Sequence, residues 1–140
     1  MRNMKILIVD DDPDVRQAMH IRLKANGYET CFASDALTTV SEARRHQPDL
    51  VLLDLGLPGG DGYTVMERLR RHPALAVIPV IVVSARDAGG NQSRVMAAGA
   101  KAYLQKPVNN SELLSVIRET LGEPAQPGDA GVTANWKLLV

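Results

Sequence analysis

The chain has 140 residues, which is enough for one domain with one sizeable hydrophobic core. Hydrophobic residues make up 45% of the sequence, charged residues 23%, and the formal net charge is zero, so composition gives no sign of attraction to nucleic acids or to membranes. The apolar run near the N-terminus is too short for a signal peptide or a membrane span, and we therefore expect a cytoplasmic protein.

Apolar runs of strand length alternate along the chain with segments whose apolar residues recur at helical spacing. In chain order, the predicted elements are a strand at 6–9, a helix from Asp12 to Asn26, a strand at 28–32, a helix from Ser34 or Asp35 to Pro48, a strand at 50–53, a helix from Tyr63 to His72, a strand at 80–83, a helix from Asn91 to Ala98, a strand at 102–104 and a helix from Asn109, Asn110 or Ser111 to Leu121.

Local signals support the helix assignments. Asp12 can cap the first helix, and Pro13 suits its first helical position. In the second helix, Leu37, Val40 and Ala43 are predicted to form the inner face. The arginines of the third helix, at positions 68, 70 and 71, are predicted to form a solvated helix face.

Five strands, each followed by a helix, predict an α/β fold with a parallel five-stranded sheet and helices on both faces. The composition changes after Gly122, where prolines and glycines become frequent. Residues 123–140 are therefore predicted to be a tail or linker that adds little to core stability. This tail contains the only tryptophan, Trp136, which could dock on the domain or on a neighbouring chain.

Polar residues follow four of the five predicted strands, at the edge of the sheet where ligands of open parallel sheets bind. They are Asp10 and Asp11 after the first strand, Asp54 after the third, Ser84 at the end of the fourth and Lys106 after the fifth. Three neighbouring carboxylates repel one another, and a hard divalent cation such as Mg²⁺ removes the conflict. Lys106 supplies a point charge for a phosphoryl group, so the set indicates a phosphoryl-transfer site.

With these residues in place, the sequence resembles a response-regulator receiver domain. The resemblance rests on four segments, residues 6–13, residues 48–58 with Asp61-Gly62, residues 79–85 and residues 99–107. It runs from about Met4 to Leu121 and implies a flavodoxin-like strand order 2-1-3-4-5, and we expect residues 4–122 to form the domain.

The resemblance also implies a role for each residue at the predicted sheet edge. Asp54 is expected to be the nucleophile that accepts the phosphoryl group. Asp11 and Asp54 are expected to ligate Mg²⁺ directly, with Asp10 acting mainly through water and the backbone carbonyl of Gly56 completing the protein ligands. Lys106 is expected to contact the phosphoryl oxygens.

Two further residues are implied to form the switch. Ser84 hydrogen-bonds to the phosphoryl group after transfer, and Tyr103 is the aromatic side chain that turns inward. The Lys106-Pro107 peptide bond is expected to be cis, which proline makes accessible.

Partners follow from the same resemblance. A sensor histidine kinase or a histidine phosphotransfer protein is expected to supply the phosphoryl group, and a downstream protein or output domain to respond. The surface expected to change lies on the helix at 91–98, the fifth strand and the last helix, with Val95, Met96 and Leu104 as candidate contacts. The same surface is a possible homodimer interface, and no direct contact with nucleic acid or membrane is expected within these residues.

Two other functions are compatible with this fold. A metal-dependent phosphatase on the same fold would use Asp54 for turnover, but Gly56 leaves no acid two residues later to protonate a leaving group. A pseudo-receiver that only binds partners is disfavoured because every expected site residue is present. We therefore predict a phosphoacceptor module that is not an enzyme.

Overall fold

The computed structural model of the protein describes residues 3–58, 61–85 and 88–124. In chain order the elements are β1 (Lys5–Val9), α1 (Pro13–Ala25), β2 (Glu29–Ala33), α2 (Ala36–His46), β3 (Leu50–Leu53), α3 (Gly62–Arg71), α4 (Pro73–Ala76), β4 (Val80–Ser84), α5 (Ala88–Ala97), β5 (Ala102–Gln105) and α6 (Asn110–Leu121).

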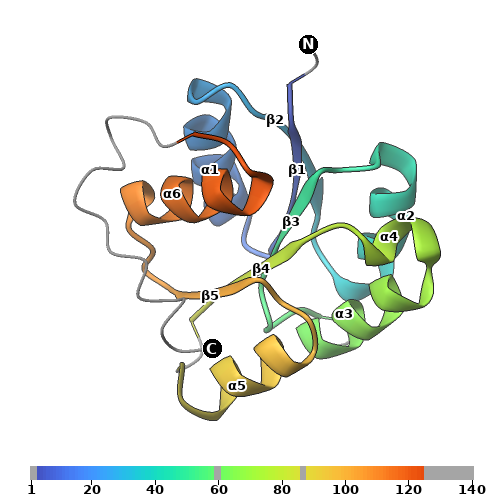
Figure 1. Ribbon diagram of the computed structural model, residues 1–140. Coiled ribbons are helices and arrows are strands. Elements are labelled where there is room, and N and C mark those ends of the chain that lie inside the picture. Colours follow the sequence, from blue (N-terminus) through green and yellow to red (C-terminus); the bar gives the residue numbers. More distant parts are fainter. Residues whose placement is uncertain (1–2, 59–60, 86–87, 125–140) are drawn as a thin grey trace.

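The strands form one parallel sheet in the order β2-β1-β3-β4-β5, with helices on both faces (Figure 1). This confirms the predicted fold class and strand order. The register sets Val9 of β1 beside Leu53 of β3, so the residues that follow these two strands emerge side by side. That pairing is what brings Asp10, Asp11 and Asp54 to one edge of the sheet.

Alternate residues of each strand point to opposite faces, and each face has its own hydrophobic core. Leu7 and Val9 face the core that is covered by α2, α3, α4 and α5. Ile6 and Ile8 face the core that is covered by α1 and α6, which lie next to each other in Figure 1. Because both faces are covered, β3 is apolar at every position, and β1 and β4 each have one polar residue, at a strand end.

Side-chain caps fix where four of the helices begin, including α3, where Asp61 accepts from the backbone N–H of Thr64. Asp12 accepts a hydrogen bond from the backbone N–H of Asp14, which follows Pro13 in the first turn of α1. Of the alternatives left open by the sequence, Asp35 caps α2 and Asn109 caps α6. Each cap satisfies a backbone donor that would otherwise lack a partner at the helix start.

The structure corrects three predicted details. The segment after His72 forms the short helix α4, where the sequence predicted only a break. The next long helix, α5, begins at Ala88 instead of Asn91. Leu37, predicted to lie on the inner face of α2, is 68% exposed, and that face is formed by Ala36, Thr39 and Ala43.

The C-terminal end of α6 is joined by hydrogen bonds to the residues that follow the C-terminal end of α1. Gly122 ends the helix in the left-handed conformation, with φ 74°, and Glu123 then accepts a hydrogen bond of 2.6 Å from the hydroxyl of Tyr28. The guanidinium of Arg118, which is buried, donates to Asn26 at 3.0 Å. Residues 125–140, including Trp136, lie outside the described residues. None of the described helices combines the length and apolarity needed to cross a bilayer.

Candidate functional site

Backbone hydrogen bonds carry the strand ladders one step past the strand ends and thereby position the polar residues. The N–H of Asp10 donates to Ala33 O at 3.2 Å, and the N–H of Asp54 donates to Val9 O at 2.9 Å. The N–H of Lys106 donates to Ser84 O at 2.8 Å. The backbones of Asp10, Asp54 and Lys106 are therefore held by the sheet, although these residues come after the strands in sequence.

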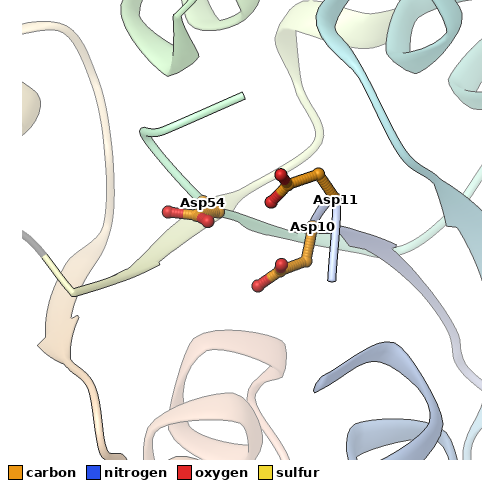
Figure 2. A group of neighbouring side chains, drawn as sticks. All are labelled: Asp10, Asp11 and Asp54. Carbon is orange, nitrogen blue, oxygen red and sulfur yellow. The ribbon is translucent and has the colours of Figure 1, made fainter. Parts of the chain in front are cut away.

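The three predicted carboxylates form one cluster (Figure 2). One carboxylate oxygen from each of Asp10, Asp11 and Asp54 lies within 4.8 Å of the other two. Asp10 is buried, Asp11 is exposed and Asp54 lies between these extremes. The cluster thus runs from the interior to solvent, which gives a ligand access to it from one side.

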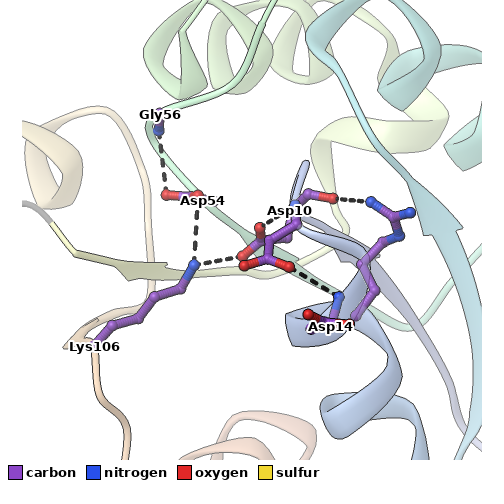
Figure 3. A network of polar contacts seen from close by, with 7 residues as sticks. Asp10, Asp14, Asp54, Gly56 and Lys106 are labelled. Atoms are coloured by element: carbon purple, nitrogen blue, oxygen red, sulfur yellow. Dashed lines mark hydrogen bonds and ion pairs between the residues drawn. The ribbon is translucent and has the colours of Figure 1, made fainter.

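Lys106 reaches into this cluster between two of the carboxylates (Figure 3). Its Nζ lies 2.5 Å from Asp10 Oδ2 and 3.5 Å from Asp54 Oδ2. Burial lowers the pKa of the ammonium, but the hydrogen bond and charge of Asp10, assisted by Asp54, outweigh this and raise the pKa above its ordinary value. Lys106 is therefore a fixed positive charge at neutral pH.

Other groups hold the two paired carboxylates in place. The N–H of Asp12 donates to Asp10 Oδ1 at 2.9 Å, and Arg16 donates to the backbone carbonyl of Asp10 at 2.6 Å. The N–H of Gly56 donates to Asp54 Oδ1 at 3.2 Å (Figure 3). Sequence reasoning did not find Arg16, because an arginine in the first turns of a helix is ordinarily a solvated residue.

The loop after Asp54 folds back against α3 at one glycine. The N–H of Gly62 donates to Leu55 O at 2.9 Å, and Leu55 is fully buried. A Cβ on Gly62 would lie 2.8 Å from the Cα of Leu55 and 3.0 Å from the backbone oxygen of Asp54. Gly62 therefore permits a close backbone approach that keeps the acceptor loop against the domain.

The remaining predicted residues also lie near this edge or in the core behind it. Ser84, at the end of β4, is 1% exposed, and Tyr103 of β5 is 5% exposed within the core under α5. The Lys106-Pro107 peptide bond is cis, as the resemblance implies. The Tyr103 ring thus occupies the interior of the domain.

The predicted partner-contact residues are wrong in two cases. Val95 of α5 is fully buried on the side of that helix that faces the sheet, and Leu104 is buried in the core on the other face of the sheet. Met96 is partly buried against the same core as Val95. Apolar residues at these positions hold the helix and strand to the domain, and so they are not available to a partner.

The charges of the cluster indicate what it can bind. Three carboxylates and one ammonium leave two negative charges in a partly buried site. A single divalent cation neutralises them, and carboxylate oxygens are the ligands that Mg²⁺ prefers. The donor set therefore fits a hard divalent cation, with one ammonium beside it to contact an anionic group.

Residues 6–118 match the family model described as the response regulator receiver domain. This chain belongs to that family. Receiver domains are phosphoacceptor regulatory modules that partner with histidine kinases, and the chain is accordingly a phosphorylation-dependent switch rather than an enzyme.

Individual relatives agree with this assignment. The chain is 39% identical over 117 residues to the DNA-binding dual master transcriptional regulator RpaA of Synechocystis sp., covering 84% of this chain and 48% of RpaA. The magnesium-bound receiver domain of the sensor histidine kinase PA1611 from Pseudomonas aeruginosa is 28% identical, with a TM-score of 0.79, and the match covers 86% of this chain and 99% of that one.

The BeF3-activated N-terminal receiver domain of Klebsiella pneumoniae RstA is 30% identical, with a TM-score of 0.78, over 84% of this chain and 97% of the other. Several curated relatives are much longer than this chain. It spans 48% of the length of RpaA and 25% of the response regulator PleD of Caulobacter vibrioides.

Proposed function

We propose that Asp54 is the phosphoacceptor of this receiver domain and that it works with Mg²⁺ held at the carboxylate cluster. The observation that carries the proposal is the position of Lys106, whose ammonium lies between Asp10 and Asp54 beside a third carboxylate. Asp54 lies farther from the Lys106 ammonium than Asp10 does, and its side chain is partly open to solvent. Of the two carboxylates paired with Lys106, that of Asp54 is therefore the one that an incoming phosphorus atom can reach.

The metal is proposed to be held by Asp11 and Asp54 directly, by Asp10 mainly through water, and by the backbone carbonyl of Gly56. Magnesium coordinated in the active-site cleft of the PA1611 receiver domain supports this choice of ion. When bound, Mg²⁺ supplies positive charge against the phosphoryl oxygens and against the repulsion within the cluster.

The chain's own residues then position the reaction. An oxygen of Asp54 attacks phosphorus, the new P–O bond forms as the bond to the donor nitrogen breaks, and the donor imidazole leaves. The Lys106 ammonium stands beside the phosphoryl oxygens as negative charge builds up there. Asp10 keeps Lys106 in place, and Arg16 with the N–H of Asp12 keeps Asp10 in place. After transfer, Ser84 and Tyr103 are proposed to sense the phosphoryl group and to bias a two-state equilibrium.

Labelling with a small phosphodonor tests this assignment. Acetyl phosphate with Mg²⁺ should give one phosphoryl group per chain, and Asp54→Asn should abolish it. Asp14→Asn is the matched control, because Asp14 is an exposed acid next to the cluster and is not part of it. Full labelling of Asp54→Asn would reject the assignment, as would equal Mg²⁺ affinities of the unaltered protein and Asp11→Ala.

We also propose a docking face for the phosphodonor protein. A hollow of about 870 Å³ lies between α1 and α6, lined mainly by apolar side chains, and it reaches Lys106 and Pro107 at the acceptor site. Ile21, which is 59% exposed, and Val15 line this hollow on α1. A helix that carries a phosphohistidine suits it, because an apolar helix face seated there would place its imidazole next to Asp54.

Two donors separate docking from chemistry. Ile21→Glu should slow transfer from a phosphorylated histidine kinase or phosphotransfer protein by at least ten-fold and leave labelling by acetyl phosphate unchanged. Leu37→Glu is the control, because Leu37 is an equally exposed apolar residue on a helix of the other face. Equal rates with the protein donor for both variants would exclude this face.

The output side of the switch is proposed to use exposed side chains of α5, β5 and α6, with homodimerisation through the same elements as one possible mode. Ser93 of α5 and Gln105 of β5 are exposed there, as is Lys101 in the loop before β5. Residues 4–122 are proposed to be the switch domain, with 123–140 as the tail or linker to a downstream protein or output domain. Sedimentation velocity with and without beryllofluoride tests for the dimer.

A further inference from the structure

A groove of about 610 Å³ lies between α3 and α5, on the face of the sheet that α2 to α5 cover (Figure 1). Its walls come from one side of each helix, because residues three or four positions apart in a helix lie on the same side. The residues that line it are Tyr63, Glu67, Arg70 and Arg71 of α3 and Arg94 and Ala98 of α5. We refer to it as the arginine groove.

Positive charge predominates in the arginine groove. Among the described residues that line it, three carry a guanidinium and one carries a carboxylate, which leaves two positive charges in excess. The chain as a whole has no formal net charge, so this excess is local. The carboxylate, on Glu67, is already paired with Arg71 at 2.6 Å. Arg70 and Arg94 therefore carry the charge that a ligand would meet.

Arg94 is held in place without being neutralised. Its guanidinium carbon lies 3.6 Å from the centre of the Tyr63 ring, within cation–π distance. The ring is fixed in turn, because the Tyr63 hydroxyl donates to Asn91 Oδ1 at 2.7 Å. Within the described part of the chain, Arg94 has no hydrogen-bond acceptor and no carboxylate partner. A guanidinium that lies over a ring keeps its N–H donors, which lie in its own plane, available to an acceptor.

Arg70 is positioned at the other end of the groove. Its Nη1 donates to the backbone oxygen of Ala98 at 3.2 Å, which leaves most of its N–H donors unused. Arg70 and Arg94 are both exposed. Two helices thus present two guanidinium groups, each positioned by one contact, and the planar fork of a guanidinium matches the two oxygens of a carboxylate.

The exposure of the groove indicates which kind of ligand it suits. Pockets for small molecules are mostly apolar and enclose most of the ligand, whereas all three arginines here are exposed. Tyrosine and arginine are residue types in which binding energy concentrates at protein interfaces, and exposed charges there select partners of opposite charge. The chain's own tail does not offer that charge, because residues 123–140 contain two acidic side chains and one basic side chain.

We propose that the arginine groove is a docking site for an acidic segment of a partner protein, whose carboxylates bind Arg94 and Arg70. The inference does not depend on the acceptor role of Asp54, and it adds α3 to the elements proposed for output. The arginines also lie in the last turns of α3 and α5, where positive charge favours the helix dipole. That role alone predicts no binding of an acidic peptide.

The probe is hexaglutamate, which is added to the full chain and followed by NMR. Binding should shift the amide signals around Tyr63 and Arg94 most, and it should weaken as salt is added, because exposed charges are screened. Arg70→Gln combined with Arg94→Gln should weaken binding roughly five-fold, the loss expected for two exposed ion pairs. Arg94→Gln alone removes no hydrogen bond within the described residues and should weaken binding roughly two-fold.

Arg44→Gln combined with Arg45→Gln is the matched control. Both arginines are exposed in the last turn of α2, and neither lines the groove. This double variant removes the same two charges from the chain and should bind hexaglutamate as the unaltered protein does. Melting curves of both double variants establish that the fold is retained, and the single Arg94→Gln variant decides the question if Arg70→Gln is unstable.

Absence of binding, or signal shifts away from α3 and α5, would overturn the inference. Equal losses in the two double variants would overturn it too, since overall charge alone would then explain the binding. Pyrophosphate that binds the groove more tightly than hexaglutamate would assign it to a small phosphate ligand instead. Self-association that disappears in the variant lacking Arg70 and Arg94, measured by sedimentation velocity, would assign it to a second copy of this chain.

Discussion

Asp10 and Asp54 carry the same side chain in two different surroundings. The side chain of Asp10 is 4% exposed and lies at 2.5 Å from the Lys106 ammonium, whereas that of Asp54 is 13% exposed and lies at 3.5 Å. Asp10 is thus the main counter-ion of Lys106, and Asp54 adds negative charge that Lys106 only partly offsets.

The two aspartates should therefore respond oppositely to the same substitution. Without metal, Asp54→Asn should raise the free energy of unfolding by about 1 kcal/mol, because it relieves repulsion within the cluster. Asp10→Asn should lower it by about 2 kcal/mol, because it removes the charge-assisted hydrogen bond of a half-buried ammonium. Urea melts in chelator measure both changes.

Magnesium provides the control for that comparison. Excess Mg²⁺ should shrink the advantage of Asp54→Asn, since the ion relieves the same repulsion and binds the unaltered protein more tightly. If Mg²⁺ left the difference in free energy of unfolding between Asp54→Asn and the unaltered protein unchanged, the carboxylates would not be coupled through their charges. The same would follow if Asp54→Asn were the less stable protein in chelator.

Glycine matters at one position of the acceptor loop and not at another. Gly62→Ala would place a Cβ 2.8 Å from the Cα of Leu55, a contact that backbone movement alone can relieve. At Gly56 a Cβ would meet nothing within 4 Å. We expect Gly62→Ala to cost about 2 kcal/mol of stability and Gly56→Ala to cost close to nothing, measured by thermal melts. Equal melting temperatures would mean that the loop is free to move away from α3.

The site residues were predictable because each follows a strand whose apolar run is unmistakable. Asp10, Asp54 and Lys106 are located by counting past those runs, and parallel pairing brings them together. Arg16 had no such signal. Its role depends on the direction in which α1 leaves β1, which places the guanidinium at the carbonyl of Asp10.

At the level of elements, sequence patterns located the strands better than the helix faces. A strand buried on both sides is an apolar run, and it can be located without deciding which of its residues face the core. For the helix α2 that decision is needed, and the pattern gave the wrong residue: Ala36 and Thr39 lie next to the core, whereas Leu37 faces solvent. Small residues there let α2 lie close to the sheet, which hydrophobicity alone does not reveal.

The hydrogen bond between Tyr28 and Glu123 means that the stability of a truncated chain depends on whether Glu123 is kept. A chain that ends at Gly122 lacks this hydrogen bond, whereas a chain that ends at Pro124 keeps it. We expect the shorter truncation to be about 1 kcal/mol less stable than the longer one, and the longer one to match the full chain. The sequence alone predicted little effect from either truncation, and melts of the three proteins decide between these outcomes.

The same connection predicts a response to alkali. Burial, assisted by the neighbouring Glu123, raises the pKa of the Tyr28 hydroxyl well above its ordinary value of 10.0. The folded state therefore keeps a proton that the unfolded state loses, so this contribution is complete below pH 10 and declines as the pH rises beyond it. Above that pH, Tyr28→Phe should lose stability less steeply than the unaltered protein in urea melts. Parallel curves would contradict this account of Tyr28.

At the scale of the whole molecule, one sheet separates two hydrophobic cores, and no described residue belongs to both. The core under α1 and α6 lies on one face of the sheet, and the core under α2 to α5 lies on the other. The acceptor site lies at the edge where both cores end, and Lys106 reaches it from the strand farthest from β2 in the sheet. The proposed docking hollow lies on the face that α1 and α6 cover.

The strand order also has a kinetic consequence. Pairing of β1 with β2 and β3 needs only the residues up to Leu53, and with the next residue, Asp54, it gathers the three carboxylates before β5 has delivered Lys106. If folding proceeds in that order, its barrier contains repulsion that the native state partly relieves. Refolding followed by circular dichroism should then accelerate as salt or Mg²⁺ is added, while unfolding changes less. Asp54→Asn should refold faster than the unaltered chain and respond less to salt, and equal salt dependence in the two would indicate that β4 and β5 join the sheet before the rate-limiting step.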